Sequence, residues 1–227
     1  MNIKDHFVSL HTKDNHQLDA FYCPSEKSSV GLIVIHEIFG LTSFIKETCE
    51  YWAHKEYQTI APALYDRYEK NVSIPYDDDG YKKAIEYKQN ALNLGSQLLD
   101  IEAAKKYLLK KGVKKIGIIG FSWGGTLGWL AACRLDGIAC INSYYGTHIY
   151  QFKDEIPKCP VLLQFAERDE LVSREHIEQI QQQHDGLTIY TYPAGHGFRC
   201  KAWCEYNFDV SKIADEKSEE FFRQNLS

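Results

Sequence analysis

The stretch KKIGIIGFSWGGTLGW, Lys114–Trp129, decides the fold of this chain. It opens with a run of apolar and β-branched residues and closes with the small and apolar residues of a packed helix. Between them, residues 120–124 have the pattern G-x-S-x-G. A sharp strand-to-helix turn needs such glycines, because Cβ atoms at the flanking positions would collide with the strand and the helix. The stretch therefore predicts a buried strand, a turn that presents Ser122, and a helix.

Short apolar segments alternate with amphipathic segments outward from this stretch in both directions. We predict strands at His6–Thr12, Gln17–Cys23, Gly31–His36, Thr59–Ala63, Lys115–Gly120, Ala139–Tyr145, Val161–Ala166 and Thr188–Tyr192. We predict helices at Phe44–Lys55, Tyr81–Lys110, Gly125–Leu135, Arg174–His184 and Lys212–Gln224, with NLG at 93–95 as a kink or break in the second of them. Residues 71–80 have the polar, turn-rich character of a surface loop. Several strands are apolar on both faces, which is typical of a parallel sheet covered by helices. The pattern predicts one α/β domain over residues 1–227.

The composition excludes several classes of function. A net charge of −5 with no long basic run argues against nucleic acid or an anionic membrane as a partner. The seven cysteines are scattered without zinc-finger or CxxC spacing, so we expect reduced thiols and no metal site. No segment has the length and apolarity of a signal peptide core or a membrane span. We expect a cytoplasmic protein without a cofactor.

Ser122 needs a base before its hydroxyl can act as a nucleophile. The other interpretations of the turn are a structural glycine turn and a dinucleotide loop. The second is disfavoured because the spacing is not G-x-G-x-x-G and no acidic residue ends a strand about 20 residues later. Because the motif follows a predicted strand and opens a predicted helix, we interpret Ser122 as the nucleophile.

An acid and a histidine should follow the serine in that order. Asp169 lies in the loop just after the predicted strand at 161–166, and Glu167 and Glu170 compete with it as acids that are equally well explained as solvated charges. Among the histidines after Ser122, His196 lies between two glycines after the last predicted strand. The others, His148, His176 and His184, fall in a polar loop or on a predicted exposed helix. We therefore predict Asp169 as the acid and His196 as the base.

The segment IVIHEIFGL, residues 33–41, ends a predicted strand where a second oxyanion donor is expected. We predict the backbone N–H groups of Ile38 and Trp123 as the donors. Glu37 follows a buried apolar run, and its position fits a structural hydrogen bond and a place near the nucleophile equally well.

With these residues in view, the chain resembles the dienelactone hydrolase family of α/β hydrolases. The similarity covers most of the chain, through HEIFGL, the P-x-L-Y motif, DIEAAKKYL, IGIIGFSWGG, SYYG and AGHGF in the family's order. It implies an α/β-hydrolase fold of about eight mostly parallel strands with helices on both faces. It also implies a triad of Ser122, Asp169 and His196, with Glu37 near the nucleophile to modulate it.

The chain departs from the family's pattern at two places. Family members usually have cysteine where this chain has Ser122, so the chain is either a natural serine member or carries a Cys-to-Ser replacement. The arginines that bind the substrate carboxylate in dienelactone hydrolase have no clear counterparts, and Lys82, Lys83 and Arg199 are the nearest candidates.

Together these features predict a metal-free hydrolase of small carboxylic esters or lactones that works through an acyl-enzyme. We expect the partner to be a small molecule and the chain to be a monomer or homodimer. A non-catalytic hydrolase-fold binding protein and an acyltransferase are the alternatives. The candidate pocket residues are Phe39, Trp123, Tyr144, Phe198 and Arg199, although aromatic residues at such spacing are more often core.

Overall fold

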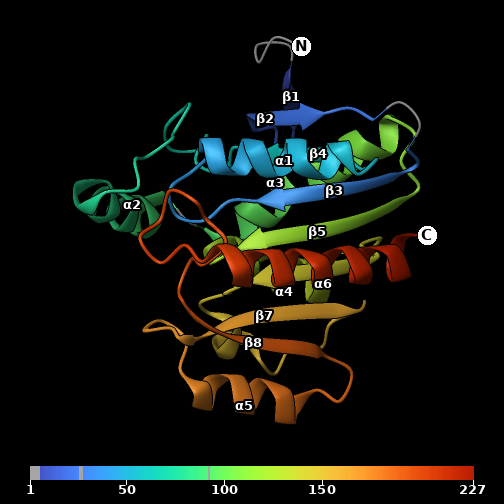
Figure 1. Ribbon diagram of the computed structural model, residues 1–227. Coiled ribbons are helices and arrows are strands. Elements are labelled where there is room, and N and C mark those ends of the chain that lie inside the picture. Colours follow the sequence, from blue (N-terminus) through green and yellow to red (C-terminus); the bar gives the residue numbers. More distant parts are fainter. Residues whose placement is uncertain (1–5, 26–27, 92) are drawn as a thin grey trace. The chain divides into compact units, whose positions relative to one another are not determined.

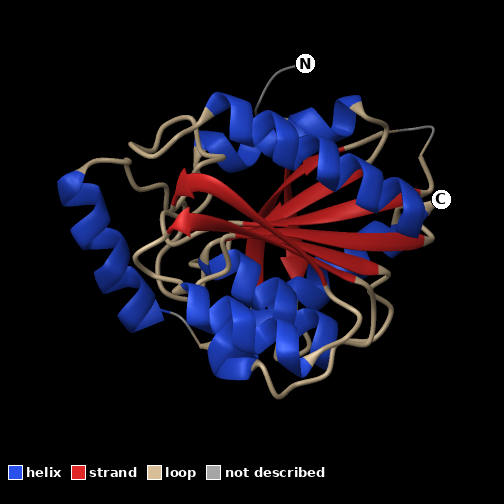
Figure 2. Cartoon of the chain, turned by 60° about the horizontal axis from the view of Figure 1, so that its bottom comes forward, coloured by secondary structure: helices blue, strands red, loops and turns tan. Residues whose placement is uncertain are grey.

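The computed structural model describes residues 6–25, 28–91 and 93–227. The chain has the predicted α/β architecture, with an eight-stranded, mostly parallel sheet. It divides into two compact units, with the boundary between Ile116 and Gly117. Figure 2 shows the strands in red and the helices in blue. Among the described residues, no helix has the length and apolarity needed to cross a bilayer.

The first unit places four strands in the order β1-β2-β4-β3. Its elements are β1 (Phe7–His11), β2 (Gln17–Cys23), β3 (Val30–Ile35), α1 (Ser43–His54), β4 (Gln58–Pro62), α2 (Asp78–Ala91) and α3 (Leu94–Lys110). β1 and β4 each pair antiparallel with β2, whereas β3 pairs parallel with β4. The first two strands form an antiparallel hairpin, with Phe7 opposite Phe21. Helix α1 buries an apolar face that includes Phe44, Ile45 and Trp52.

The second unit is entirely parallel, in the order β5-β6-β7-β8. Its elements are β5 (Lys115–Phe121, of which the first two residues belong to the first unit), α4 (Trp123–Arg134), β6 (Cys140–Tyr144), the 3₁₀ helix η2 (Ile149–Phe152), β7 (Val161–Arg168), α5 (Arg174–Gln183), β8 (Thr188–Gly195) and α6 (Phe208–Leu226). Figure 1 shows α5 beside β8, and α6 packs against β6, β7 and β8. Because parallel strands end at the same edge of a sheet, the loops after β5, β6, β7 and β8 gather there.

A buried hydrogen-bond network joins α6 to the sheet of the second unit. Ser218 on α6 accepts hydrogen bonds from Asn142 Nδ2 at 2.7 Å and Gln164 Nε2 at 3.0 Å. Gln164 Oε1 accepts another from the Tyr192 hydroxyl at 2.7 Å. Ser218 and Gln164 are fully buried, so these bonds satisfy polar groups that would otherwise destabilise the core. The network fixes the helix against three neighbouring strands.

All eight predicted strands are present, with ends displaced by a few residues. The helix predicted over residues 81–110 is instead two helices, separated at the predicted NLG break. Asn93 is the reason, because its side chain accepts hydrogen bonds from the backbone N–H groups of Gly95 and Ser96 and so caps the start of α3. The prediction missed the short helix η2, whose four residues are too few for a periodic pattern.

The prediction of a surface loop over residues 71–80 is wrong in two respects. Val72 and Ile74 are buried, and the last three residues already belong to α2. The segment hydrogen-bonds to the loop after β3, since Leu41 N–H donates to Val72 O at 3.0 Å and Ile74 N–H donates to Phe39 O at 2.9 Å. Apolar and polar residues alternate in this segment, so that its apolar side chains are buried while its backbone pairs with the loop. The prediction missed this because it followed the turn-forming residues of the segment.

Candidate active site

Ser122 occupies the turn between β5 and α4 with φ of 51°, a conformation that side-chain-bearing residues rarely adopt. Its backbone N–H donates to Tyr144 O at 2.9 Å, which ties the turn to the end of β6. A Cβ atom on Gly120 would lie 2.1 Å from Gly124 O, and one on Gly125 would lie 2.3 Å from Ser143 Oγ. These close approaches explain why glycines surround the serine.

The loop that carries His196 depends on glycine in the same way. Gly197 has φ of +82°, and a Cβ atom there would lie 2.6 Å from the Trp203 ring. A Cβ atom on Gly195 would lie 2.1 Å from the Glu205 carboxylate. The glycines let the chain turn sharply after β8 and leave the His196 side chain 19% exposed.

The structure brings Ser122, Asp169 and His196 together within the second unit. His196 Nε2 lies 3.0 Å from Ser122 Oγ, and His196 Nδ1 lies 2.8 Å from Asp169 Oδ2. An ionised carboxylate only accepts hydrogen bonds, so Nδ1 carries the proton and Nε2 is left to accept from the serine hydroxyl. The Asp169 side chain is fully buried, and its other oxygen accepts from Leu171 N–H at 2.9 Å. In this geometry the His196 imidazole is placed to accept the proton of the Ser122 hydroxyl.

The competing acids and histidines lie in different surroundings. Glu167 and Glu170 are exposed, as the solvated interpretation predicts. The His148 Nδ1 atom lies 2.7 Å from Thr147 Oγ1, and the His148 ring packs edge-on against Trp123. The other two histidines contact the short helix and its flank: His176 stacks on Tyr150, and His184 Nε2 donates to Lys153 O at 2.5 Å.

Two aromatic residues adjoin the triad. Trp123 is the first residue of α4, at the positive end of the helix dipole, where its backbone N–H can favour a developing oxyanion. Tyr145 packs edge-on against the His196 ring, with the ring centroids 5.0 Å apart. The sequence did not single out Tyr145, although SYYG was among the motifs that carried the family resemblance, and its φ of 41° marks it as a constrained position.

The predicted pocket residues are largely internal. Tyr144 and Phe198 are fully buried and pack against neighbouring aromatic rings, and Phe39 is buried against Tyr76. Arg199 is buried, and its Nε donates to Asp215 Oδ1 at 2.9 Å. Lining of a substrate pocket by these residues stays a prediction.

Glu37 and Ile38 lie in the loop that follows β3 of the first unit. Glu37 is buried and accepts a hydrogen bond from the Tyr76 hydroxyl, while its Oε2 atom has no partner among the described residues. Burial raises the pKa of Glu37 to about 7, although the Tyr76 hydrogen bond works in the opposite direction. Ile38 O accepts from the Tyr65 hydroxyl at 2.7 Å, which fixes the loop from within the unit. Their predicted roles toward the nucleophile stay predictions.

The neighbouring His36 is a neutral structural histidine. Leu64 N–H donates to His36 Nε2 at 3.2 Å, so the other ring nitrogen carries the proton and donates to Glu37 O at 2.5 Å. Burial lowers the pKa of His36 to about 4.

Over residues 6–25, 28–91 and 93–227, no group of three or more His, Cys, Asp or Glu side chains is placed to hold a metal ion.

Comparison with known proteins identifies the family of this chain. Residues 18–226 match the Dienelactone hydrolase family. The chain belongs to that family. One member, a carboxymethylenebutenolidase from Pseudomonas putida, is 26% identical over 223 residues, which cover 94% of each chain. The motifs quoted from the sequence all lie within the matched residues.

Solved structures agree with the fold. A dienelactone hydrolase-like promiscuous phosphotriesterase from metagenomic libraries superposes with a TM-score of 0.79 at 16% identity, over 97% of this chain and 98% of its own. An esterase from Pyrococcus furiosus superposes with a TM-score of 0.76 at 15% identity, over 100% of this chain and 95% of its own. At these identities the likeness is one of fold.

Proposed function

We propose that this chain hydrolyses small carboxylic esters or lactones with Ser122 as the nucleophile. The observation that carries the proposal is the pair of contacts that His196 makes, 3.0 Å to Ser122 Oγ and 2.8 Å to Asp169 Oδ2. Membership in the dienelactone hydrolase family supports it, as does the name of the Pseudomonas putida relative, which is a carboxymethylenebutenolidase.

In the proposed reaction, His196 Nε2 accepts the proton of the Ser122 hydroxyl while Oγ bonds to the substrate's carbonyl carbon. The carbonyl oxygen becomes an oxyanion, which the Trp123 N–H at the start of α4 stabilises. When the tetrahedral intermediate collapses, the carbon–alkoxide bond breaks and the alkoxide takes the proton from the imidazolium. This leaves Ser122 acylated.

Water completes the cycle. His196 accepts a proton from the water molecule, whose oxygen attacks the acyl carbon and forms a second oxyanion intermediate. The bond to Ser122 Oγ then breaks, the serine recovers its proton from His196, and the carboxylic acid leaves. Throughout the cycle Asp169 stays ionised, holds the imidazole in the productive tautomer and stabilises its charged form.

The first test combines a covalent probe with a substrate. We expect a fluorophosphonate to label Ser122 in the wild-type chain and not in Ser122→Ala, and we expect the variant to lose p-nitrophenyl acetate hydrolysis by roughly 10⁴-fold or more. Ser143→Ala serves as the control, since Ser143 is a buried serine next to the turn that receives no role in the reaction.

Retention of hydrolysis by folded Ser122→Ala would refute the proposal. Absence of both labelling and hydrolysis in the wild-type chain would support the binding-protein alternative, because fluorophosphonates need an activated serine. Transfer of the acyl group to an added alcohol in preference to water would support an acyltransferase.

A further inference from the structure

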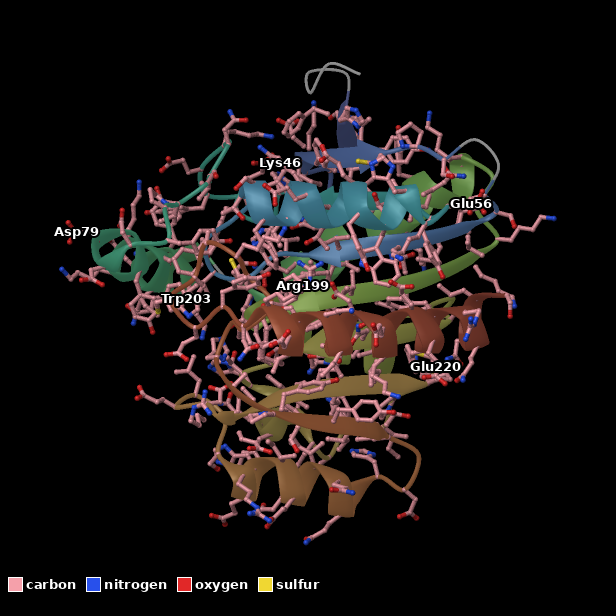
Figure 3. All side chains as sticks on the ribbon, in the orientation of Figure 1. Lys46, Glu56, Asp79, Arg199, Trp203 and Glu220 are labelled. Carbon is pink, nitrogen blue, oxygen red and sulfur yellow. The ribbon has the colours of Figure 1, made fainter. Side chains whose placement is uncertain are left out.

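One partly buried carboxylate joins three parts of the second unit. Asp215, on α6, accepts two hydrogen bonds on the same oxygen, Oδ1. The Tyr144 hydroxyl at the end of β6 donates one at 2.8 Å, and Arg199 Nε in the segment after β8 donates the other at 2.9 Å. Figure 3 shows Arg199 beside the N-terminal half of α6.

Each donor is linked to a triad residue, Tyr144 by a backbone hydrogen bond and Arg199 by a short stretch of chain. The carbonyl oxygen of Tyr144 accepts the Ser122 N–H at 2.9 Å, so the tyrosine holds the nucleophile turn with its backbone and Asp215 with its side chain. Arg199 lies three residues after His196. The chain between them is held at Phe198, whose carbonyl oxygen accepts from Ser211 Oγ at 2.7 Å and Asn207 N–H at 3.0 Å.

The ion pair is too buried to be an ordinary surface contact. The side chains of Arg199 and Asp215 are 11% and 15% exposed. Burial works to lower the pKa of Arg199, but the charge of Asp215 and the neighbouring Tyr144 outweigh it and raise that pKa, so the guanidinium stays charged. The desolvation free energy of two buried charges is roughly as large as their electrostatic attraction. Such a pair therefore adds little net stability, and its main effect is to fix the positions of the two side chains.

We propose that Asp215 is a positioning residue: through Tyr144 and Arg199, its carboxylate sets the separation between the Ser122 turn and the His196 loop. The inference rests on the proposed function. It gives the buried ion pair a purpose that packing alone would not require, because an apolar pair of similar volume would fill the same space. Proton transfer is sensitive to this separation, since a displacement of about 1 Å can reduce the rate by about 10²-fold.

The variant that separates positioning from folding is the double substitution Arg199→Met/Asp215→Leu. It removes both charges together, so neither is left buried without a partner, and the free energy of unfolding should stay near the wild-type value. We expect kcat for p-nitrophenyl acetate to fall by about 10²-fold with KM changed less than about threefold. Fluorophosphonate labelling should slow in parallel.

Ser218→Ala is the matched control. Ser218 lies one turn beyond Asp215 on α6 and also contacts the Tyr144 hydroxyl, at 2.7 Å, but its hydrogen bonds within the described part of the chain do not include the loop that carries His196. Its loss should lower the melting temperature and leave kcat unchanged. If the double variant also keeps the wild-type kcat, Asp215 is purely structural and the proposal is wrong.

A readout that needs no substrate separates this inference from the proposed function. The proton on His196 Nδ1, hydrogen-bonded to the buried Asp169, should give a downfield NMR resonance that His196→Gln removes. We expect the double variant to broaden or shift this resonance and Ser218→Ala to preserve it. An unchanged resonance in the double variant would overturn the positioning role, whether or not the chain proves to be an esterase.

Discussion

The three residues of the candidate triad differ in backbone conformation and in burial. Ser122 is held on a turn with positive φ, His196 is partly exposed between two glycines, and Asp169 is buried. The Asp169 carboxylate accepts from both a backbone N–H and the imidazole, and the second of these hydrogen bonds fixes the ring's tautomer. At this scale the proposed chemistry depends on the hydrogen bond that His196 Nδ1–H donates to the Asp169 carboxylate.

Asp169→Asn should therefore lower kcat for ester hydrolysis by about 10⁴-fold, because an amide can stabilise the wrong tautomer of His196. Steady-state kinetics on p-nitrophenyl acetate measures the effect. Glu167→Gln and Glu170→Gln change exposed carboxylates next to it and should retain activity within about twofold. A large loss in either glutamine variant, with Asp169→Asn active, would move the acid to another residue.

At the scale of elements, the turn between β5 and α4 is set by backbone clearance. The helix begins immediately after the serine, so its first turn crosses close to the end of the strand. A Cβ atom added to Gly120 would lie only 2.1 Å from Gly124 O, which leaves no room for a methyl group. The neighbouring atom belongs to the backbone, so it cannot rotate away as a side chain could.

Gly120→Ala should accordingly destabilise the chain by at least about 2 kcal/mol and abolish ester hydrolysis, because the turn must open to admit the methyl group. Chemical denaturation measures the first effect. Gly186→Ala is the control, since a Cβ atom there meets nothing within 4 Å. Equal stability of the two alanine variants would show that the turn tolerates a side chain.

On the scale of the whole molecule, buried ionisable groups make stability depend on pH. Glu37 is the clearest case, because burial raises its pKa from an ordinary value of 4.5 to about 7. Between these values the folded chain keeps a proton that the unfolded chain has lost. Folding therefore becomes less favourable as the pH rises from about 4.5 to 7, and the full penalty persists above that range.

Glu37→Gln should remove this penalty, since the amide resembles the protonated acid and can still accept from Tyr76. Relative to the wild-type chain, the variant should gain about 3 kcal/mol in free energy of unfolding between pH 4.5 and pH 8. Urea denaturation at both pH values measures the gain, and Glu47→Gln on the exposed face of α1 should show none. A gain that does not depend on pH would mean that Glu37 is ionised throughout.

The sequence by itself determined the class of fold and the order of the candidate triad. Apolar runs, glycines and helix caps act over a few residues. The strands, the break at Asn93 and the turn at Ser122 could therefore be predicted from short stretches of sequence. The sequence favoured Asp169 as the acid but left Glu167 and Glu170 as competitors, because the difference in burial among the three depends on the packing of whole elements. The same holds for Val72 and Ile74, whose burial follows from hydrogen bonds to the loop after β3. Tertiary structure alone brought Asp215 to Tyr144, because a contact between residues 71 positions apart depends on how α6 packs against the sheet.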